Sequence, residues 1–250
     1  MRRAVILAGG EGTRLRPYTT VLPKPLMPIG DRPVLDIVVR QLKAHGFERI
    51  TIATGYLAEL IEAFFRDGES YGIPIDYFRE HEPLGTVGAL ALIDGLLDDH
   101  VLVMNGDVLT DIDYGALLER HSVSDAAATI ATKTRQIQVS LGVLRFSDDG
   151  DPTRLTGYDE KPAIDYIASM GVYCFAPRAL SFIEPGEYLD FPSLVLRLLA
   201  AGQKVTTYAS AARWLDLGRF EDLQLASEIF AESRAEFLPE ADDLALRAAS

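Results

Sequence analysis

The feature that most constrains the fold of this chain is a glycine-rich stretch that directly follows a short apolar run near the N-terminus. Residues 4–7 predict a buried strand of a parallel sheet, so the glycines fall at its carboxyl end, where open α/β sheets bind ligands. Because glycine permits positive φ angles and close backbone approach, successive N–H groups here can converge on an anion. Three glycines and three cations meet that need: Gly9, Gly10, Gly12, Arg14, Arg16 and Lys24. The stretch therefore predicts a site for a polyphosphorylated ligand.

Two common glycine motifs are absent from this stretch. A dinucleotide fingerprint needs G-x-G-x-x-G running into a helix, and a Walker loop needs G-x-x-x-x-G-K-[ST]. Four prolines also prevent a long helix after the glycines: Pro17, Pro23, Pro25 and Pro28. Residues 9–30 are therefore expected to form a long ordered loop, held down by Leu15, Leu22, Leu26, Met27 and Ile29.

The first 110 residues alternate between strand and helix patterns. Helices are predicted over residues 33–46, 57–68 and 85–97, and strands over 49–54, 75–78 and 101–104. This alternation predicts an α/β fold: a Rossmann-like, mostly parallel sheet of mixed strand direction, with helices on both faces.

The second half of the chain changes character. Its predicted strands cover residues 125–132, 140–146, 154–158, 168–175, 204–208 and 213–215, with turn residues at 147–152. Helices are predicted over residues 177–183, 191–201 and 220–233. These strands are expected to run in mixed directions and to build the acceptor side of a cleft. Residues 236–250 are acidic and weakly patterned, and fit either a short packed helix or a frayed tail.

Composition limits the partners and the compartment. The chain has 250 residues and a formal net charge of -13, which argues against nucleic acid or an anionic membrane as a partner. Neither a long apolar run nor a signal-peptide pattern is present, so we expect a cytoplasmic protein without a membrane span. The single cysteine, Cys174, lies in an apolar run and is predicted to be a core residue, not a nucleophile.

The segment from Gly9 to Pro28 follows the pattern G-G-x-G-T-R-L-x-P-x-T-x-x-x-P-K-P-x-x-P. This pattern resembles the signature of the sugar nucleotidyltransferases, also called NDP-sugar pyrophosphorylases. The resemblance implies the nucleotide-diphospho-sugar transferase fold, which is GT-A-like, and a loop that wraps the triphosphate of an NTP. Arg14 would stabilise the pyrophosphate leaving group, and Lys24 would lie near the reacting phosphates. The nucleotide-binding residues in this segment and just before it would be Leu7, Ala8, Gly9, Gly10, Gly12, Thr13 and Arg14.

Two aspartates are candidate metal ligands. Asp107 follows the predicted strand 101–104, and Asp216 lies in the sequence W-L-D-L-G, which resembles a late W-x-D-x-G motif of the family. The resemblance implies that both hold Mg²⁺, a cation that prefers oxygen ligands, and that Asp107 also contacts the nucleotide. Taken singly, either aspartate would more often be a turn residue or a helix cap.

A D-x-D pair, Asp111 and Asp113, offers a different interpretation. Glycosyltransferases of similar architecture use such a pair to hold a metal and a nucleotide diphosphate. In this chain the pair directly precedes a helical pattern, so capping of that helix is the favoured explanation.

The acceptor would be bound by residues of the second half. Glu160, Lys161 and Pro162 resemble the family's E-K-P motif, in which the glutamate binds sugar hydroxyls and the lysine binds the sugar phosphate. Gly142 matches a family glycine whose backbone faces the sugar. Without the resemblance, the tripeptide would be an ordinary exposed turn.

The base would be recognised by the segment from Glu80 to Gly88. Its sequence resembles the E-x-x-P-L-G-T-x-G form of guanylyltransferases for mannose and heptose 1-phosphates. Glu80 could accept hydrogen bonds from the two adjacent N–H donors of guanine, and Gly85 would let the backbone lie close to the base. Some pyrimidine-specific relatives also carry glutamate here, so dTTP and UTP remain open beside GTP.

Together these patterns predict a nucleotidyltransferase that joins an NTP, GTP favoured, to a sugar 1-phosphate and releases pyrophosphate. Mannose 1-phosphate or a related sugar or cyclitol phosphate is the expected acceptor, with glucose 1-phosphate and dTTP or UTP as the alternative. We expect a catalytic domain over residues 1–235, with a nucleotide half to about 110 and an acceptor half over 111–235. Residues 236–250 would be a tail, and no β-helix domain would follow.

The oligomeric state and two rival functional classes complete the prediction. The family suggests a homo-oligomer, a dimer or larger. The rival classes are a GT-A-type glycosyltransferase and a catalytically silent nucleotide-sensing subunit. The second rival is disfavoured because five residues of the expected machinery are all present: Arg14, Lys24, Asp107, Lys161 and Asp216.

Overall fold

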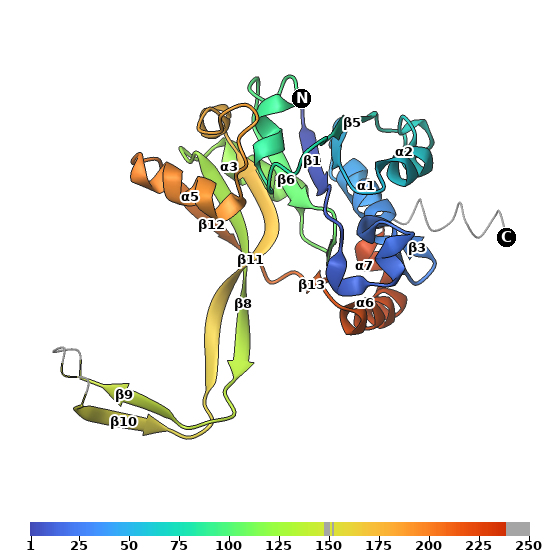
Figure 1. The fold of residues 1–250 in the computed structure, drawn as a ribbon. Coiled ribbons are helices and arrows are strands. Elements are labelled where there is room, and N and C mark those ends of the chain that lie inside the picture. Colours follow the sequence, from blue (N-terminus) through green and yellow to red (C-terminus); the bar gives the residue numbers. More distant parts are fainter. Residues whose placement is uncertain (148–150, 152, 239–250) are drawn as a thin grey trace.

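The computed structural model of the chain describes residues 1–147, 151 and 153–238. A seven-stranded sheet forms its centre, in the order β12-β8-β11-β6-β1-β4-β5 (Figure 1). Strand β11 pairs antiparallel with β6 and β8, and the other pairs are parallel. The predicted α/β class, with a mostly parallel sheet of mixed direction, is confirmed. The strands are β1 (Arg3–Ala8), β4 (Arg49–Thr54), β5 (Ile75–Arg79), β6 (Val101–Asn105), β8 (Ala128–Gln138), β11 (Ala163–Phe175) and β12 (Val205–Ala209).

Helices cover both faces of the sheet because its central strands are apolar on both sides. Ile6 of β1 packs in one cluster with α1 (Val34–Ala44), α2 (Ala58–Phe65) and α3 (Tyr114–Ser122). Its neighbour Val5 points to the opposite face, into a cluster with α4 (Pro177–Leu180) and α5 (Phe191–Ala200). Within the described ranges, no helix has the length and apolar character needed to cross a membrane.

The loop over residues 9–30 is ordered, as predicted. It contains the 3₁₀ turns η1 (Thr13–Leu15), η2 (Tyr18–Thr20) and η3 (Lys24–Leu26), and it ends in β2 (Pro28–Ile29), which pairs with β3 (Arg32–Pro33). Leu15, Met27 and Ile29 are buried in a third cluster with α6 (Phe220–Glu232) and α7 (Arg234–Phe237). Strands β7 (Val108–Thr110) and β13 (Trp214–Asp216) pair beside it. Phe237 is buried, and residues 239–250 of the expected tail lie outside the described residues.

Strands β8 and β11 extend beyond the sheet as a two-stranded ribbon that leaves the body of the molecule (Figure 1). The ribbon carries the hairpin of β9 (Val143–Phe146) and β10 (Leu155–Asp159) at its far end, and we call residues 133–169 the arm. The predicted strands 125–132 and 168–175 miss the arm, because β8 continues to Gln138 and β11 begins at Ala163 through their mutual pairing. The predicted strand 140–146 was wrong at its start: Gly142 precedes β9.

The predicted helix over residues 85–97 is also wrong. Only a 3₁₀ turn, η5 (Gly88–Leu92), forms in this segment. Gly85 and Gly95 have left-handed φ angles of 76° and 73°, which a regular right-handed helix over residues 85–97 does not contain. The backbone N–H groups of Val87 and Gly88 donate instead to the carbonyl of Leu189, at 3.1 and 3.3 Å.

Cys174 lies on β11 with its side chain fully buried. Burial in an apolar cluster raises the pKa of its thiol, so the reactive thiolate is disfavoured. The prediction of a core cysteine is confirmed.

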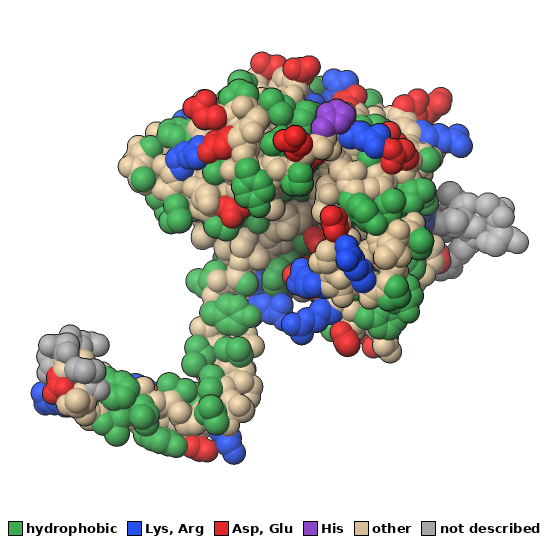
Figure 2. Space-filling model, in the orientation of Figure 1, with side chains coloured by type: hydrophobic (Ala, Val, Ile, Leu, Met, Phe, Trp, Pro, Cys, Tyr) green, Lys and Arg blue, Asp and Glu red, His purple; other side chains and the backbone are tan. Residues whose placement is uncertain are grey.

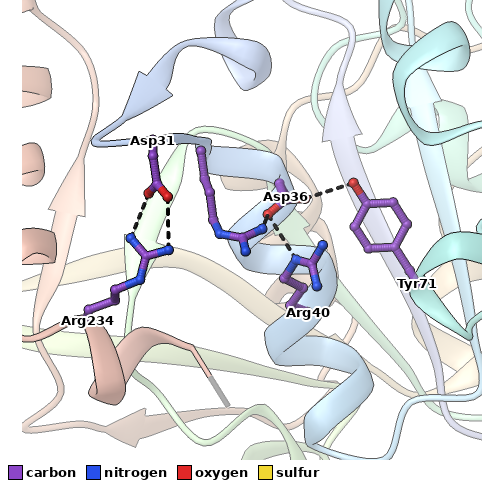
Figure 3. Close-up of polar contacts among 6 residues, drawn as sticks. Asp31, Asp36, Arg40, Tyr71 and Arg234 are labelled. Atoms are coloured by element: carbon purple, nitrogen blue, oxygen red, sulfur yellow. Dashed lines mark hydrogen bonds and ion pairs between the residues drawn. The ribbon is translucent and has the colours of Figure 1, made fainter. Parts of the chain in front are cut away.

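A buried polar network ties the start of α1 to the turn η4 (Glu69–Tyr71). Asp36 is 4% exposed and accepts hydrogen bonds from Arg32 (2.7 Å), Arg40 (3.0 Å) and the Tyr71 hydroxyl (2.8 Å). Figure 3 shows Arg40 and Tyr71 converging on this carboxylate. Burial and the adjacent Asp36 charge raise the pKa of Tyr71, which therefore remains a neutral donor.

Asp36→Asn is expected to lower the free energy of unfolding by about 2 kcal/mol, because the buried Arg32 loses its charged partner. Urea denaturation followed by circular dichroism measures the change. Asp31→Asn is the matched control: the Asp31 side chain is 56% exposed and pairs with Arg234, which is 25% exposed, so its loss is expected to change stability by less than ~1 kcal/mol (Figure 3). Equal losses in the two variants would show that the Asp36 network adds no special stability.

Candidate active site

The carboxyl ends of four parallel strands meet at one edge of the sheet. Ala8, the last residue of β1, pairs with Thr54 of β4, and Thr54 pairs in turn with Arg79 of β5. On the other side of β1, Leu7 pairs with Asn105 of β6. The residues that follow these strands therefore lie in one row: Gly9, Gly55, Glu80 and Gly106.

A cavity of about 670 Å³ opens along this row. Its volume is in the range typical of small-molecule sites. Every residue that the sequence predicted to bind the nucleotide lines it, together with Lys24: Leu7, Ala8, Gly9, Gly10, Gly12, Thr13, Arg14, Glu80, Gly85 and Asp107. The structure thus brings together residues from the glycine loop and from the ends of β5 and β6.

Two glycines that line the cavity are closely packed. A Cβ atom on Gly55 would lie 2.8 Å from the carbonyl oxygen of Gly9, closer than real Cβ contacts allow. A Cβ atom on Gly9 would lie 3.2 Å from Oε1 of Glu80. The absence of both side chains lets the loop backbone lie directly against β4 and against the Glu80 carboxylate.

Glu80 is held at the cavity wall by its own backbone and by the segment that follows. Its N–H donates to Thr54 (2.8 Å), and its Oε2 accepts the N–H of Leu84 (3.2 Å). Burial raises the pKa of its carboxyl above the ordinary value, and the Leu84 hydrogen bond opposes that shift. Leu84 thereby fixes one oxygen of the Glu80 carboxylate, and Glu80 lines the cavity.

Lys24 is an almost fully buried lysine, 8% exposed, that reaches the cavity from the loop. Its Nζ forms an ion pair with Asp107. A buried ammonium requires such a partner, so the pair orients both side chains at the carboxyl end of β6.

Asp216 lies beside Asp107 because β13 pairs with β7. Asp216 is opposite Val108, and the N–H of Leu217 donates to the carbonyl of Asp107 at 3.2 Å. The pKa of Asp216 is raised by partial burial first and by the Asp107 charge second, while Lys24 and Arg14 lower it. Two like charges are therefore held near one another, with two cations close by.

Arg14 joins this group through the turn that follows Asp216. A Cβ atom on Gly218 would lie 2.9 Å from a guanidinium nitrogen of Arg14, so the arginine lies directly against the backbone of the W-L-D-L-G segment. The early loop and the late motif, about 200 residues apart in the chain, thus form one cluster of charges.

The donor set at this cluster fits Mg²⁺. Among the described residues, no group of three or more histidine, cysteine, aspartate or glutamate side chains could hold a metal. Mg²⁺ in nucleotide sites usually takes one or two carboxylates and fills its remaining positions with phosphate oxygens and water. Asp107 and Asp216 are the two carboxylates that could fill this role, and a nearby cation would relieve the repulsion by which Asp107 raises the pKa of Asp216.

The three residues predicted to bind the sugar phosphate lie together, but not at the cavity. The Tyr158 hydroxyl donates to Glu160 (3.0 Å), and Lys161 Nζ lies 3.9 Å from the Glu160 carboxylate. The Tyr158 hydroxyl lies directly against Gly142, 2.2 Å from where a Cβ atom on that residue would stand. We call these four residues the acceptor cluster. No described residue of the arm lines the cavity.

The D-x-D pair has structural roles. Asp113 caps α3 by accepting the N–H of Ala116 at 2.8 Å, and Asp111 accepts the N–H of Arg213 at 2.7 Å. Neither residue lines the cavity. The capping interpretation is confirmed.

Several cavity residues were not identified from the sequence. Tyr56 follows β4, so the argument from strand ends could have found it. Tyr188 comes from a loop more than 100 residues later, and no local pattern marks it. Gly85 explains its position: a Cβ atom there would lie 2.4 Å from the Leu189 carbonyl, so this glycine lets the Tyr188 loop close against the cavity wall.

Known proteins are similar to this chain in sequence and in fold. The sequence profile of the nucleotidyl transferase family matches residues 3–233. The chain is 34% identical over 239 residues to a UTP–glucose-1-phosphate uridylyltransferase of Synechocystis, covering 88% of this chain and 61% of that protein. It is 34% identical over 222 residues to a mannose-1-phosphate guanylyltransferase of Mycobacterium tuberculosis, covering 88% and 62%. The chain thus spans about three fifths of the length of these relatives.

Solved structures agree with these relationships. HddC from Yersinia pseudotuberculosis, crystallised with GMP-PN, has a TM-score of 0.69 and 27% identity, covering 92% of this chain and 100% of HddC. A Bacillus anthracis protein solved with sucrose has a TM-score of 0.73 and 24% identity, covering 92% and 95%, and supports the fold alone. The expected resemblance to sugar nucleotidyltransferases is confirmed. By sequence and by fold, the chain belongs to the nucleotidyl transferase family.

Proposed function

We propose that this chain joins an NTP, preferentially GTP, to a sugar 1-phosphate and releases pyrophosphate. The observation that carries the proposal is that Arg14, Lys24 and Asp107 line a cavity together with the glycine loop, while Asp216 lies beside Asp107. The named activities of the relatives, a uridylyltransferase and a guanylyltransferase for sugar 1-phosphates, support the reaction class. Mannose 1-phosphate or a related sugar or cyclitol phosphate is the proposed acceptor.

The reaction needs positioning and charge neutralisation more than proton transfer. An oxygen of the sugar phosphate attacks the α-phosphorus in line, the new P–O bond forms, and the bond to the β-phosphate oxygen breaks. Since a phosphate monoester is already deprotonated at neutral pH, no general base is required. The loop N–H groups and Arg14 would hold the β and γ phosphates, and Lys24 would face the phosphates. Mg²⁺ held by Asp107 and Asp216 would neutralise charge on the α-phosphate and the leaving group.

A panel of NTPs tested against sugar 1-phosphates with Mg²⁺ examines the proposal directly. Pyrophosphate release is expected with GTP and mannose 1-phosphate or a related acceptor. Faster release with dTTP or UTP and glucose 1-phosphate would overturn the base assignment and keep the reaction class. Release of a nucleoside diphosphate from a nucleotide sugar would instead support the glycosyltransferase alternative. An inactive chain that still binds NTP would support a nucleotide-sensing role.

Lys161→Ala is expected to lower kcat/KM for the sugar phosphate by about 10- to 100-fold, because one charge-assisted contact is lost. The KM for the NTP should stay within about twofold, since Lys161 does not line the nucleotide cavity. Lys43→Ala, an exposed lysine on α1, is the matched control and should behave like the wild type. A loss of NTP affinity in the Lys161 variant would contradict the acceptor role.

A further inference from the structure

The position of the arm does not fit a single-chain active site under the proposed function. If Glu160 and Lys161 bind the sugar phosphate, they must reach a cavity that none of the described arm residues lines. In Figure 1 the β9–β10 hairpin lies at the far end of a ribbon that projects away from the body. The cavity of one chain, as it stands, has a nucleotide site without an acceptor site.

The hairpin has one apolar face that nothing in the described chain covers. Leu144 is opposite Tyr158, and Phe146 is opposite Leu155, with exposed fractions of 46–60%. The other face carries the bidentate ion pair of Arg145 with Asp159. Such segregation of apolar and charged residues is typical of a strand pair that packs one face against protein.

The ribbon has the same character. Ile137 is opposite Ile164, and both are exposed. Figure 2 shows hydrophobic side chains at intervals along the arm. Among the described residues between 137 and 167, nine large apolar side chains are exposed: Ile137, Leu141, Leu144, Phe146, Leu155, Tyr158, Ile164, Tyr166 and Ile167. A two-stranded ribbon has little stability of its own in water, so this surface needs a partner.

The base of the arm is anchored, and this limits where the arm can dock. Lys133 Nζ donates to the carbonyl of Ala211 (3.0 Å) and also to that of Ala212. The Arg135 guanidinium lies over the ring of Trp214, 5.3 Å from its centroid. Because these contacts hold the ribbon in its outward direction, folding the arm back onto its own cavity would require breaking them.

The acceptor cluster is preformed in this outward position. Lys161 has a φ of 47°, a left-handed conformation that a non-glycine residue rarely adopts. Its carbonyl accepts the Gln138 side chain at 2.6 Å, and the carbonyl of Pro162 accepts the N–H of Val139 at 3.0 Å. Strain of this kind persists where the surrounding structure enforces it, and it concentrates at functional sites.

We propose that the arm docks on a second copy of this chain, so that Glu160 and Lys161 of one copy complete the active site of the other. A second copy is the one partner that necessarily offers the surface the acceptor cluster needs, a nucleotide cavity of the same family. The exchange is reciprocal: each copy gives its arm and receives one, which closes a two-fold dimer. This inference rests on the proposed function for the role of the cluster, but the dimer itself does not.

Mixed dimers test the exchange. A chain with Asp107→Asn and a chain with Lys161→Ala are each expected to release pyrophosphate poorly. Co-expressed with different affinity tags and purified through both, they form dimers in which one site combines an intact body with an intact arm. That dimer is expected to recover roughly half of the wild-type rate. Recovery no greater than that of the single variants, with an active wild type, would show that each arm serves its own cavity and would overturn the inference.

The size of the protein gives a second test that does not depend on activity. The wild type is expected to be a dimer by light scattering at micromolar concentration, and Leu144→Ser to shift it toward monomer. Val123→Ser, which changes an apolar side chain 88% exposed on the body, should leave the dimer intact. A monomeric wild type, or a Leu144 variant as dimeric as the Val123 control, would overturn the exchange. If the wild type is inactive with every substrate pair, the proposed function fails, while these results still decide the arm's partner.

Discussion

Replacing Asp107 by asparagine is expected to lower pyrophosphate release by about 10³-fold or more, or roughly 4 kcal/mol of transition-state stabilisation. The substitution removes one of two carboxylates proposed to hold Mg²⁺ and also removes the charged partner of Lys24. An unpaired ammonium at this position would be left beside Arg14 with only Asp216 to balance it. The phosphates and the metal would then be misplaced together, so added Mg²⁺ should restore little of the rate.

The fold should survive this change, because Asp107 lies at the cavity surface and not in an apolar cluster. Pyrophosphate release measured across a range of Mg²⁺ concentrations, together with thermal unfolding, separates the two effects. Asp98→Asn is the matched control: it makes the same change of charge at an exposed residue outside the cavity and should keep full activity. Undiminished turnover in the Asp107 variant would remove this residue from the site.

Much of the nucleotide site could be predicted because it depends on local features. Strands end where apolar runs end, and the ends of parallel strands share one edge, so Gly9, Glu80 and Asp107 could be placed near each other from sequence alone. The pairing of Asp216 with this edge needed the motif as well. Its partner strand β7 is only three residues long and carries no signal of its own.

The arm could not be predicted, because its structure depends on contacts between strands and not on local composition. Residues 133–138 alternate among basic, polar and isolated apolar side chains, a pattern that also suits a loop. What makes them a strand is pairing with residues 163–169, and what directs them outward is the anchoring of Lys133 and Arg135 at the body. The wrong helix over 85–97 also reflects tertiary packing, since Gly85 has a left-handed φ of 76° and lies directly against the backbone of Leu189.

Exchange of Glu80 for glutamine is expected to lower kcat/KM for GTP by roughly 10²- to 10³-fold, and to change kcat/KM for UTP far less. A carboxylate can accept both adjacent N–H donors of guanine, whereas an amide places an NH₂ donor against one of them. In the wild type the N–H of Leu84 donates to Oε2 of Glu80. In the glutamine variant this bond would hold the amide oxygen toward Leu84 and leave the NH₂ group facing the base. Gln224→Glu makes the reverse change at an exposed position of α6, outside the cavity, and is the control for altered charge.

The pH dependence of GTP use, compared between the wild type and the Glu80→Gln variant, gives a second test of this residue. Burial raises the pKa of Glu80, so the folded chain takes up this proton at a higher pH than the unfolded chain does. Ionised Glu80 therefore opposes folding at neutral pH, and the opposition disappears as pH falls through the raised pKa. Wild-type use of GTP should decline over that same fall in pH, because the protonated carboxyl accepts poorly. The glutamine variant should be at least as stable as the wild type at neutral pH and should lack this decline. Steady-state kinetics with GTP and with UTP between about pH 4.5 and 8, from near the ordinary carboxyl pKa to neutrality, measures this dependence. The same GTP preference in both proteins throughout that range would contradict the assignment.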